Sequence, residues 1–555
     1  MKDHSQHGSQ RNTETATPEE IRFVTPFGYM FPRQARDPMA RLPDDDDGSV
    51  REALLQLGSV MADPGEQGNE QRQFNSRIPA AMTYLGQFID HDMTSRTDRD
   101  PGEFEAFPLP PLQQGEDPKK ILEQLHVASE DGSLRSPLEP VSPDLVVRFV
   151  TNGRRPRLDL DSVYGDGPPL SNDGTETESD KLYDANRRLK VNQASGYIDV
   201  PRTSDKDVEK PGKTALIADM RNDENLLISQ LHAAFLAFHN AVATEMEGED
   251  TTRYSKARQR VRWAYQYIVA NEFLPEVCDP AVVDDIRRNG VRFYSPAANG
   301  GIRFMPLEFS VAGFRFAHSM IRPFYRLNHE QTHNITTLLG TSRGPLIENN
   351  QVTPESVLRW ENLTDVGCWG RRNPQAARRI DTKLAEGLLN LPMAEGEDNF
   401  LSHLAQRNLA RGYLLSLPTG EAVAQAMGIK PLPTDVLYSD PDKKVQKKLT
   451  EVLSTLGYAD KERCIGRTPL WYYVLKEAET RTKGNSLGAV GSRLVAETIL
   501  GSLECDPDSY LNSDSSAIRR DGIEMPRCRT RRHERPERIA CLADMLAYAD
   551  VPITD

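Results

Sequence analysis

The stretch YLGQFIDHDMTS, residues 84–95, joins a mostly apolar run to three adjacent ionisable side chains. Residues 85–89 read as part of a helix, and Asp90, His91 and Asp92 follow them directly. A charged side chain is costly to bury unless it has a partner. The triplet therefore predicts a cation, a metal ion or a cofactor close to this stretch.

Length, composition and charge favour a globular protein and argue against one that binds nucleic acid. The chain has 555 residues, of which 38% are apolar and 27% charged, as expected for a globular protein with a large core. Its net charge of -14 argues against a nucleic-acid partner, because phosphate binding needs clustered positive charge. The six cysteines show no CxxC spacing, so neither a zinc knuckle nor a redox motif is expected.

The polar N-terminus lacks the apolar segment of a signal peptide, and no apolar run approaches the roughly 20 residues that span a bilayer. We therefore expect no transmembrane segment and a cytoplasmic location by default, with secretion by a signal-independent route still open. The sequence makes no prediction about the oligomeric state.

Composition divides the chain into three parts. Residues 1–75 are rich in Pro, Gly and acidic residues and predict an N-terminal arm with one helix near residues 50–61. Residues 76–545 form one large expected domain, and residues 546–555 form a short tail. Within the domain, the Pro-rich segment 98–145 predicts a long surface loop with a helix near residues 118–127.

Helical patterns dominate from residue 214 onward. In ENLLISQLHAAFLAFHNAVATEM, residues 224–246, apolar side chains recur with the 3.6-residue period of one long buried helix. Further helices are expected at 252–272, 305–321, 399–415, 443–456 and 488–503. The sequence thus predicts a mainly α, single large helical domain with long loops and little β-structure.

Four segments place charged or polar residues one helical turn apart. They are GQFIDHD; RNDEN, with Arg221 and Glu224; AGFRFAHSMIRPFYRL, with Arg315 and His318; and QRNLARGYLLSLPTG, with Asn408 and Arg411. Each has a simpler structural interpretation. A helical histidine is usually a hydrogen-bonded core residue, an Arg and a Glu one turn apart usually form a surface pair, and an Asn-x-x-Arg pair can cap a helix.

Taken together, the segments resemble the heme peroxidases of the animal peroxidase family, within the peroxidase–cyclooxygenase superfamily. The resemblance follows order and spacing over about residues 80–500. It includes GQ-x-x-DHD, the R-x-x-E helix start, LHAAFLAFHN, F-R-x-x-H, N-x-x-RG, DLDSVYG and LGAVGSRLVAETILGSL. With no signal peptide expected, the chain is identified as a bacterial-type or otherwise compact member of the family.

The resemblance implies a distal side built from three residues. His91 would be the distal histidine, which takes a proton from hydrogen peroxide and returns it to the leaving oxygen. Arg221 would stabilise the negative charge that develops as the O–O bond breaks. Gln87 matches the glutamine that hydrogen-bonds ligands and halide in the distal cavity.

The resemblance also implies how heme b is held. His318 would be the proximal ligand of the heme iron, with Asn408 as acceptor for its second ring nitrogen. Arg315 and Arg411 would pair with heme propionates, although a structural salt bridge is an equally simple role for each.

Two carboxylates match the family's positions for covalent attachment of the heme. Asp90 and Glu224 correspond to the residues that form ester bonds to heme methyl groups in mammalian members. Asn225 stands where the best-known halogenating member has a methionine, so no sulfonium link can form here.

A calcium site is implied beside the distal helix, because oxygen-rich ligands suit calcium. Its expected ligands are Asp92, Asp159, Asp161 and the carbonyl of Arg157. This sequence departs from the family in having Asp161 where a serine is usual and Arg155 where a threonine hydroxyl often binds. The alternative is a charged turn held by neighbouring arginines.

The implied function is a peroxidase that reduces hydrogen peroxide and oxidises a small donor, a halide, a pseudohalide or a phenol, through a ferryl porphyrin radical. A fatty-acid dioxygenase of the same superfamily is the nearest alternative, but it needs a tyrosine where Arg315 stands. A non-catalytic heme-binding protein would not need both His91 and Arg221. A metal hydrolase using His91 and its neighbouring carboxylates would bind a metal without heme.

Overall fold

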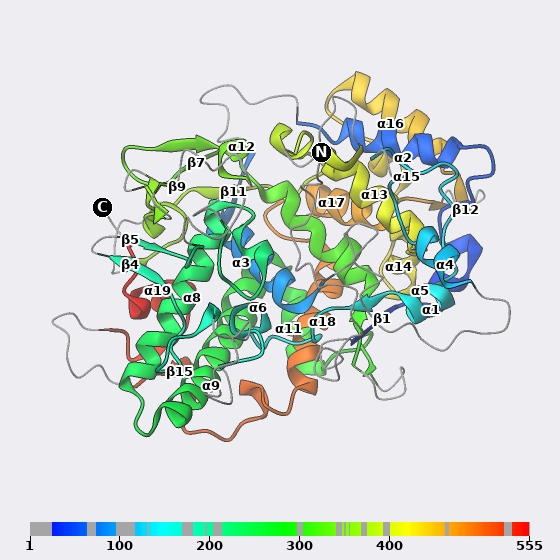
Figure 1. Cartoon of the computed structure of the whole chain (residues 1–555). Coiled ribbons are helices and arrows are strands. Elements are labelled where there is room, and N and C mark those ends of the chain that lie inside the picture. Colours follow the sequence, from blue (N-terminus) through cyan, green and yellow to red (C-terminus); the bar gives the residue numbers. More distant parts are fainter. Residues whose placement is uncertain are drawn as a thin grey trace.

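Helices make up most of the described structure. The computed structural model describes residues 25–63, 74–95, 117–129, 132–168, 181–194, 197–203, 214–296, 303–339, 347–348, 351–353, 356–367, 374–391, 400–460, 465–526 and 535–553. Its strands are only two to five residues long. The predicted mainly α architecture is therefore confirmed (Figure 1).

The regular elements follow one another along the chain with short strands between helices. The α-helices are α1 (Pro32–Arg36), α2 (Ser49–Val60), α3 (Ala81–Met93), α4 (Pro118–Gln124), α5 (Pro143–Phe149), α6 (Asp161–Tyr164), α8 (Leu226–Glu245), α9 (Asp250–Ile268), α10 (Leu274–Val277), α11 (Pro280–Asn289), α12 (Ile335–Leu338), α13 (Leu404–Leu414), α14 (Gly420–Ala426), α15 (Thr434–Leu437), α16 (Lys443–Thr455), α17 (Leu470–Arg481), α18 (Ala489–Cys505) and α19 (Leu542–Ala549). The strands are β1 (Thr25–Gly28), β2 (Asn75–Pro79), β3 (Thr151–Asn152), β4 (Asn192–Ala194), β5 (Tyr197–Asp199), β6 (Met305–Pro306), β7 (Phe324–Arg326), β8 (Thr332–Asn334), β9 (Ile347–Glu348), β10 (Gln351–Val352), β11 (Ala376–Arg378), β12 (Tyr458–Asp460), β13 (Ile465–Gly466), β14 (Ile518–Arg519), β15 (Gly522–Glu524) and β16 (Arg538–Ile539).

Helix α3 lies near the middle of the molecule, between α8 and α19 on one side and the α13–α17 group on the other (Figure 1). It packs against α8, and most of its residues are buried. The long helix predicted from LLISQLHAAFLAFHN is α8, and its side chains are buried along nearly its whole length. By length and composition α8 could span a membrane, but 89% of its apolar window is buried inside the fold, as in a core helix.

Two expected helices depart from regular α geometry. The segment expected as one helix over 305–321 is a π-helical turn, η8 (Glu308–Ala312), followed by a 3-10 helix, η9 (Gly313–Met320). The backbone breaks at Ala312, which has φ -132° and ψ -65°. A second π-turn, η6 (Val269–Phe273), follows α9. Such turns change the direction in which the following side chains point and are common at functional sites.

The described part of the expected N-terminal arm packs against the rest of the domain. Strand β1 pairs antiparallel with β3 and parallel with β6, which immediately precedes η8. The buried carboxylate of Glu308 accepts hydrogen bonds from the backbone N–H groups of Met30 and Phe31, at 2.9 and 3.0 Å. The helix expected near residues 50–61 is α2, which packs against α13 and α16.

Candidate active site

His91 lies in the last turn of α3, with only 4% of its surface exposed. Its Nδ1 atom is 2.8 Å from Oδ1 of Asn222, which belongs to the 3-10 helix η5 (Met220–Asp223). Its Nε2 atom is 3.7 Å from the Glu224 carboxylate. The two ring nitrogens therefore face different partners, one a buried amide and the other a carboxylate.

A hydrogen-bond network connects Gln87, one helical turn before His91, to the start of α8. The Gln87 side-chain amide donates to the carboxylate of Glu224, and its oxygen accepts from Nδ2 of Asn225 at 3.1 Å. Oδ1 of Asn225 accepts from the backbone N–H of Ile228 at 2.9 Å and thereby caps α8. The structure thus brings the predicted residues Gln87, His91 and Glu224 together.

Asn222 and His232 are polar residues of this site that the sequence did not single out. Nδ2 of Asn222 lies 3.0 Å from Nδ1 of His232, and both residues are fully buried. Asn222 lies inside RNDEN and His232 inside LHAAFLAFHN, two segments that carry the resemblance, but neither residue was given a role there. The contact between His91 and Asn222 joins residues 131 positions apart, so no local pattern could reveal it.

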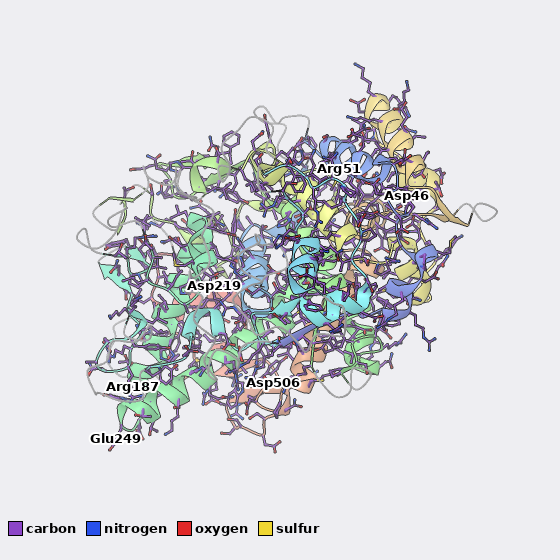
Figure 2. All side chains as sticks on the ribbon, turned by 45° about the vertical axis from the view of Figure 1, so that its right-hand side comes forward. Asp46, Arg51, Arg187, Asp219, Glu249 and Asp506 are labelled. Atoms are coloured by element: carbon purple, nitrogen blue, oxygen red, sulfur yellow. The ribbon has the colours of Figure 1, made fainter. Side chains whose placement is uncertain are left out.

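Arg221 is held by the buried carboxylate of Asp219, which also binds Arg154. Nη2 of Arg221 donates to Asp219 at 2.7 Å and to the backbone carbonyls of His91 and Thr94, both at 2.9 Å. The structure therefore directs this guanidinium towards the backbone of His91. Figure 2 shows Asp219 in the interior of the molecule, whereas Glu249 lies at its edge.

Burial by itself would raise the pKa of Asp219, but the positive charges of Arg221 and Arg154 outweigh it and hold the pKa well below its ordinary value. A carboxyl whose pKa is lower in the folded state contributes stability above its unfolded pKa, about 4. This contribution is lost as the pH falls below that value, because the proton then binds more strongly to the unfolded chain.

Replacing Asp219 with alanine is expected to lower the free energy of unfolding by about 3–5 kcal/mol at neutral pH, because two largely buried guanidinium groups lose their shared carboxylate. Urea unfolding measures the change. The matched control is Asp250→Ala, which removes the partner of Arg253 in a pair whose side chains are 37% and 39% exposed. That change should cost no more than about 1 kcal/mol. Equal losses in the two variants would contradict a stabilising role for Asp219.

Asp90 lies on the partly exposed side of α3. Its Oδ1 atom accepts a hydrogen bond from the hydroxyl of Thr94 at 2.8 Å. The other carboxylate predicted for covalent attachment is Glu224, whose side chain is 43% exposed and accepts a hydrogen bond from Gln87.

The predicted proximal residues His318 and Asn408 are in contact. His318 is on η9 and Asn408 on α13, and Nδ2 of Asn408 lies 2.9 Å from Nδ1 of His318. A neutral imidazole that binds a metal through Nε2 carries its proton on Nδ1 and needs an acceptor there. The amide would therefore have to turn to present its oxygen when His318 binds a metal. The ring of Trp471 stands edge-on to His318, with 6.4 Å between ring centroids.

The two remaining arginines donate to backbone carbonyls. Nε of Arg315 donates to Ser310 at 2.8 Å, and Nη1 of Arg411 donates to Leu125 at 3.0 Å. A partly open pocket of about 430 Å³, open solvent included, is lined by Asn408 and Trp471 but not by either predicted heme histidine. Because neither His91 nor His318 lines this pocket, we do not take it as the reaction site.

Three buried carboxylates lie near one another at the predicted calcium site. Asp92 comes from α3, and Asp159 and Asp161 flank Leu160, whose φ of 62° is left-handed. Burial and the neighbouring charges of Asp159 and Asp161 raise the pKa of Asp92 well above its ordinary value. Burial, followed by the charge of Asp159, raises the pKa of Asp161 to about 7. Such a cluster favours a cation.

The surroundings of this cluster fit a cation only in part. Oxygens of all three carboxylates and of Ser162 are buried without a hydrogen-bond partner among the described residues. However, Arg157 donates to Asp159 at 2.6 Å, and in the part of the chain that the structure describes no three His, Cys, Asp or Glu side chains are gathered closely enough to hold a metal. The orphaned oxygens fit calcium, but the carboxylates would have to draw together to bind it.

The central site has the groups that heme requires. α3 and η9, which carry the two predicted heme histidines, pack against each other. Five polar or charged side chains in this central region remain partly or largely exposed: Gln87, Asp90, Glu224, Arg315 and His318. A bound cofactor would cover them. The donor set is also suitable, because an imidazole with a hydrogen-bonded second nitrogen is a common iron ligand.

Comparison with known proteins identifies the family to which the chain belongs. The profile described as "Animal haem peroxidase" matches residues 59–456. Peroxidasin homolog pxn-2 of Caenorhabditis elegans is 28% identical over 291 residues, which are 46% of this chain and 21% of that protein. Thyroid peroxidase of Rattus norvegicus is 27% identical over 214 residues, which are 36% of this chain and 22% of that protein. The aligned parts thus cover about a fifth of these relatives.

Solved structures share the fold at low sequence identity. Peroxidase A from Dictyostelium discoideum has a TM-score of 0.57 and 16% identity, with 91% of each chain covered. Oryza sativa fatty acid alpha-dioxygenase has a TM-score of 0.51 and 14% identity, with 98% of this chain and 85% of that chain covered. The matching profile extends over well more than half of the sequence and includes the residues around His91 and His318. The chain belongs to the animal haem peroxidase family.

Proposed function

We propose that this chain is a heme-dependent peroxidase that reduces hydrogen peroxide and oxidises a small halide, pseudohalide or phenolic donor. The observation that carries the proposal is the placement of His91. Its Nδ1 is held by Asn222, its Nε2 lies beside Glu224, and its helix packs against the 3-10 helix that bears His318.

Heme, when bound, supplies the iron centre for peroxide reduction and the oxidising equivalents for the donor. His318 would hold the iron, with Asn408 fixing the ring. Nε2 of neutral His91 would take the proton of hydrogen peroxide and deliver it to the departing oxygen as water forms. The Glu224 carboxylate, 3.7 Å from Nε2, would favour the protonated ring.

Arg221 would contribute positive charge behind His91. Its guanidinium binds the backbone carbonyl of His91, so it stabilises the end of α3 as well as the site. Because Asp219 neutralises part of this charge, the two residues together would set the electrostatic stabilisation of the departing oxygen. Gln87, tied to Glu224 and Asn225, would orient small ligands above His91.

The dioxygenase alternative predicts different chemistry at the proximal helix. Both kinds of protein share this fold, so the fold does not separate them. The residue three positions before His318 is Arg315, and arginine cannot form the radical that abstracts hydrogen from a lipid. Arginine at position 315 therefore favours the peroxidase over the dioxygenase.

Absorption spectroscopy tests the proposal. We expect a Soret band from protein supplied with heme, a shift of that band within milliseconds of adding one equivalent of hydrogen peroxide, and its return when iodide or a phenol is added. A band that ignores peroxide would indicate a non-catalytic heme protein. Oxygen uptake with a fatty acid would indicate the dioxygenase, and a folded protein without a heme band would overturn the cofactor assignment.

We also propose calcium as a ligand of Asp92, Asp159 and Asp161, with the Arg157 carbonyl completing the site. Calcium at about 100 times its dissociation constant should stabilise the fold by about 2.7 kcal/mol. Thermal unfolding with calcium and with a chelator measures this difference. The Asp92→Asn variant should lose most of the response. Identical melting temperatures of the native protein under both conditions would exclude a stabilising calcium ion.

A further inference from the structure

Three buried side chains from three different elements form a continuous hydrogen-bonded chain behind the distal site. His91 on α3 contacts Asn222 on η5, and Asn222 contacts His232 on α8. Asn222 and His232 are fully buried, and His91 is nearly so. Such a chain determines where protons sit, because an amide offers an acceptor at its oxygen and only donors at its nitrogen.

We propose that Asn222 and His232 are positioning residues that fix the tautomer of His91 with its proton on Nδ1 and its lone pair on Nε2. The inference rests on the proposed function, since only a proton acceptor at Nε2 gives the tautomer a catalytic consequence. Neither residue touches the reacting atoms; each acts through His91.

The amide of Asn222 faces one imidazole with its acceptor oxygen and the other imidazole with its donor nitrogen. Its Oδ1 faces Nδ1 of His91 at 2.8 Å and can only accept, so Nδ1 of His91 must donate. Its Nδ2 faces Nδ1 of His232 at 3.0 Å and can only donate, so Nδ1 of His232 must accept. Reversing the amide would reverse both tautomers and leave a hydrogen on Nε2 of His91, where a base needs a lone pair.

His232 is suited to hold the amide in one orientation. Its ring packs edge-on against Phe88, with 6.3 Å between ring centroids. Among the described residues no group bonds its Nε2, so the contact with Asn222 is the hydrogen bond that the structure gives this buried ring. Burial outweighs the opposing charges of Asp219 and Asp223 and lowers the pKa of His232 to about 4, which keeps its Nδ1 an acceptor near neutral pH.

One proton is taken up and released at Nε2 of His91 in each turnover, and Asn222 stays unchanged throughout. Nε2 of His91 takes the proton of hydrogen peroxide, and the ring becomes a cation that still donates its Nδ1 hydrogen to Asn222. When Nε2 returns the proton to the departing oxygen, the ring regains the same neutral tautomer. The amide therefore stabilises the cationic ring and prepares it for the next turnover.

The test reads the tautomer directly in the full-length protein without heme. Nitrogen NMR of selectively labelled histidines, with the His91 signal assigned from His91→Gln, should show a proton on Nδ1 and none on Nε2. Asn222→Leu removes the acceptor and His232→Leu removes the partner of the amide, so both should lose this single tautomer. Asn222→Asp, which keeps an acceptor, should retain the Nδ1 proton.

The matched control is His239→Leu. His239 is on the same helix and is equally buried, but its Nδ1 contacts the hydroxyl of Tyr164 at 3.0 Å. This variant should leave the His91 signal unchanged. With heme bound, Asn222→Leu and His232→Leu should slow the peroxide reaction about 10- to 100-fold, and His239→Leu should not.

Two results would overturn the proposal. One is a native His91 with its proton on Nε2, and the other is an unchanged tautomer in a folded Asn222→Leu protein. If that variant does not fold, His232→Gln gives the second comparison. Its side-chain oxygen can accept a hydrogen bond from Asn222, so its His91 signal should match that of the native protein. Because the NMR measurement needs no heme, it separates failure of this proposal from failure of the proposed peroxidase function.

Discussion

Replacing His91 with alanine is expected to slow the reaction with hydrogen peroxide by about 100- to 10,000-fold, the usual contribution of general acid–base catalysis. Heme should remain bound, because its iron would be held from the opposite face by His318. The loss has a simple origin. Without the imidazole, the position of Nε2 no longer holds a group that takes the proton of the peroxide and returns it to the departing oxygen.

Stopped-flow absorption at the Soret band measures this rate under pseudo-first-order conditions. His333→Ala is a suitable control, since it removes an imidazole from strand β8 without touching α3. Heme content and the melting temperature of each variant should be recorded alongside the rate. A His91→Ala protein that reacts as fast as the native protein would show that His91 is not the base.

Replacing His318 with alanine should cause a large loss of bound heme, whereas the His91→Ala protein should keep its heme. The iron would lose its protein ligand, and the ring contact with Trp471 and the hydrogen bond with Asn408 would go with it. Replacing Asn408 with leucine removes only the partner of the ring, so heme affinity should fall by about 10- to 100-fold, as for other groups that orient a metal ligand.

Titration of heme into the purified variants, followed by absorbance, gives both affinities. Added imidazole should restore part of the native spectrum in His318→Ala, because a free ring can take the vacant position. His333→Ala again serves as the control. Native heme affinity in His318→Ala would assign the iron ligand to another residue, whereas a weakened but measurable affinity in Asn408→Leu would support the positioning role of the asparagine.

The sequence by itself determined the helical architecture and the order of the main site residues. Helical periodicity over 224–246 predicted α8, since a helix that packs on a core repeats its apolar side chains every three or four positions. The same short spacing placed Gln87 one turn before His91, and Arg221 just ahead of Glu224. Resemblance to the family supplied the roles of these residues, and the profile match confirmed the family.

The tertiary structure alone decided which buried groups meet. Asn222 lies against His91 across 131 positions, and Arg154 reaches Asp219 across 65 positions. Regular helical spacing does not report such contacts, because it describes only neighbours on one element. The helical period over 305–321 likewise did not reveal the break at Ala312, where a π-turn gives way to a 3-10 helix and both pack against α17 and α18. Local pattern predicted most of the helices, and long-range packing decided which buried groups contact each histidine.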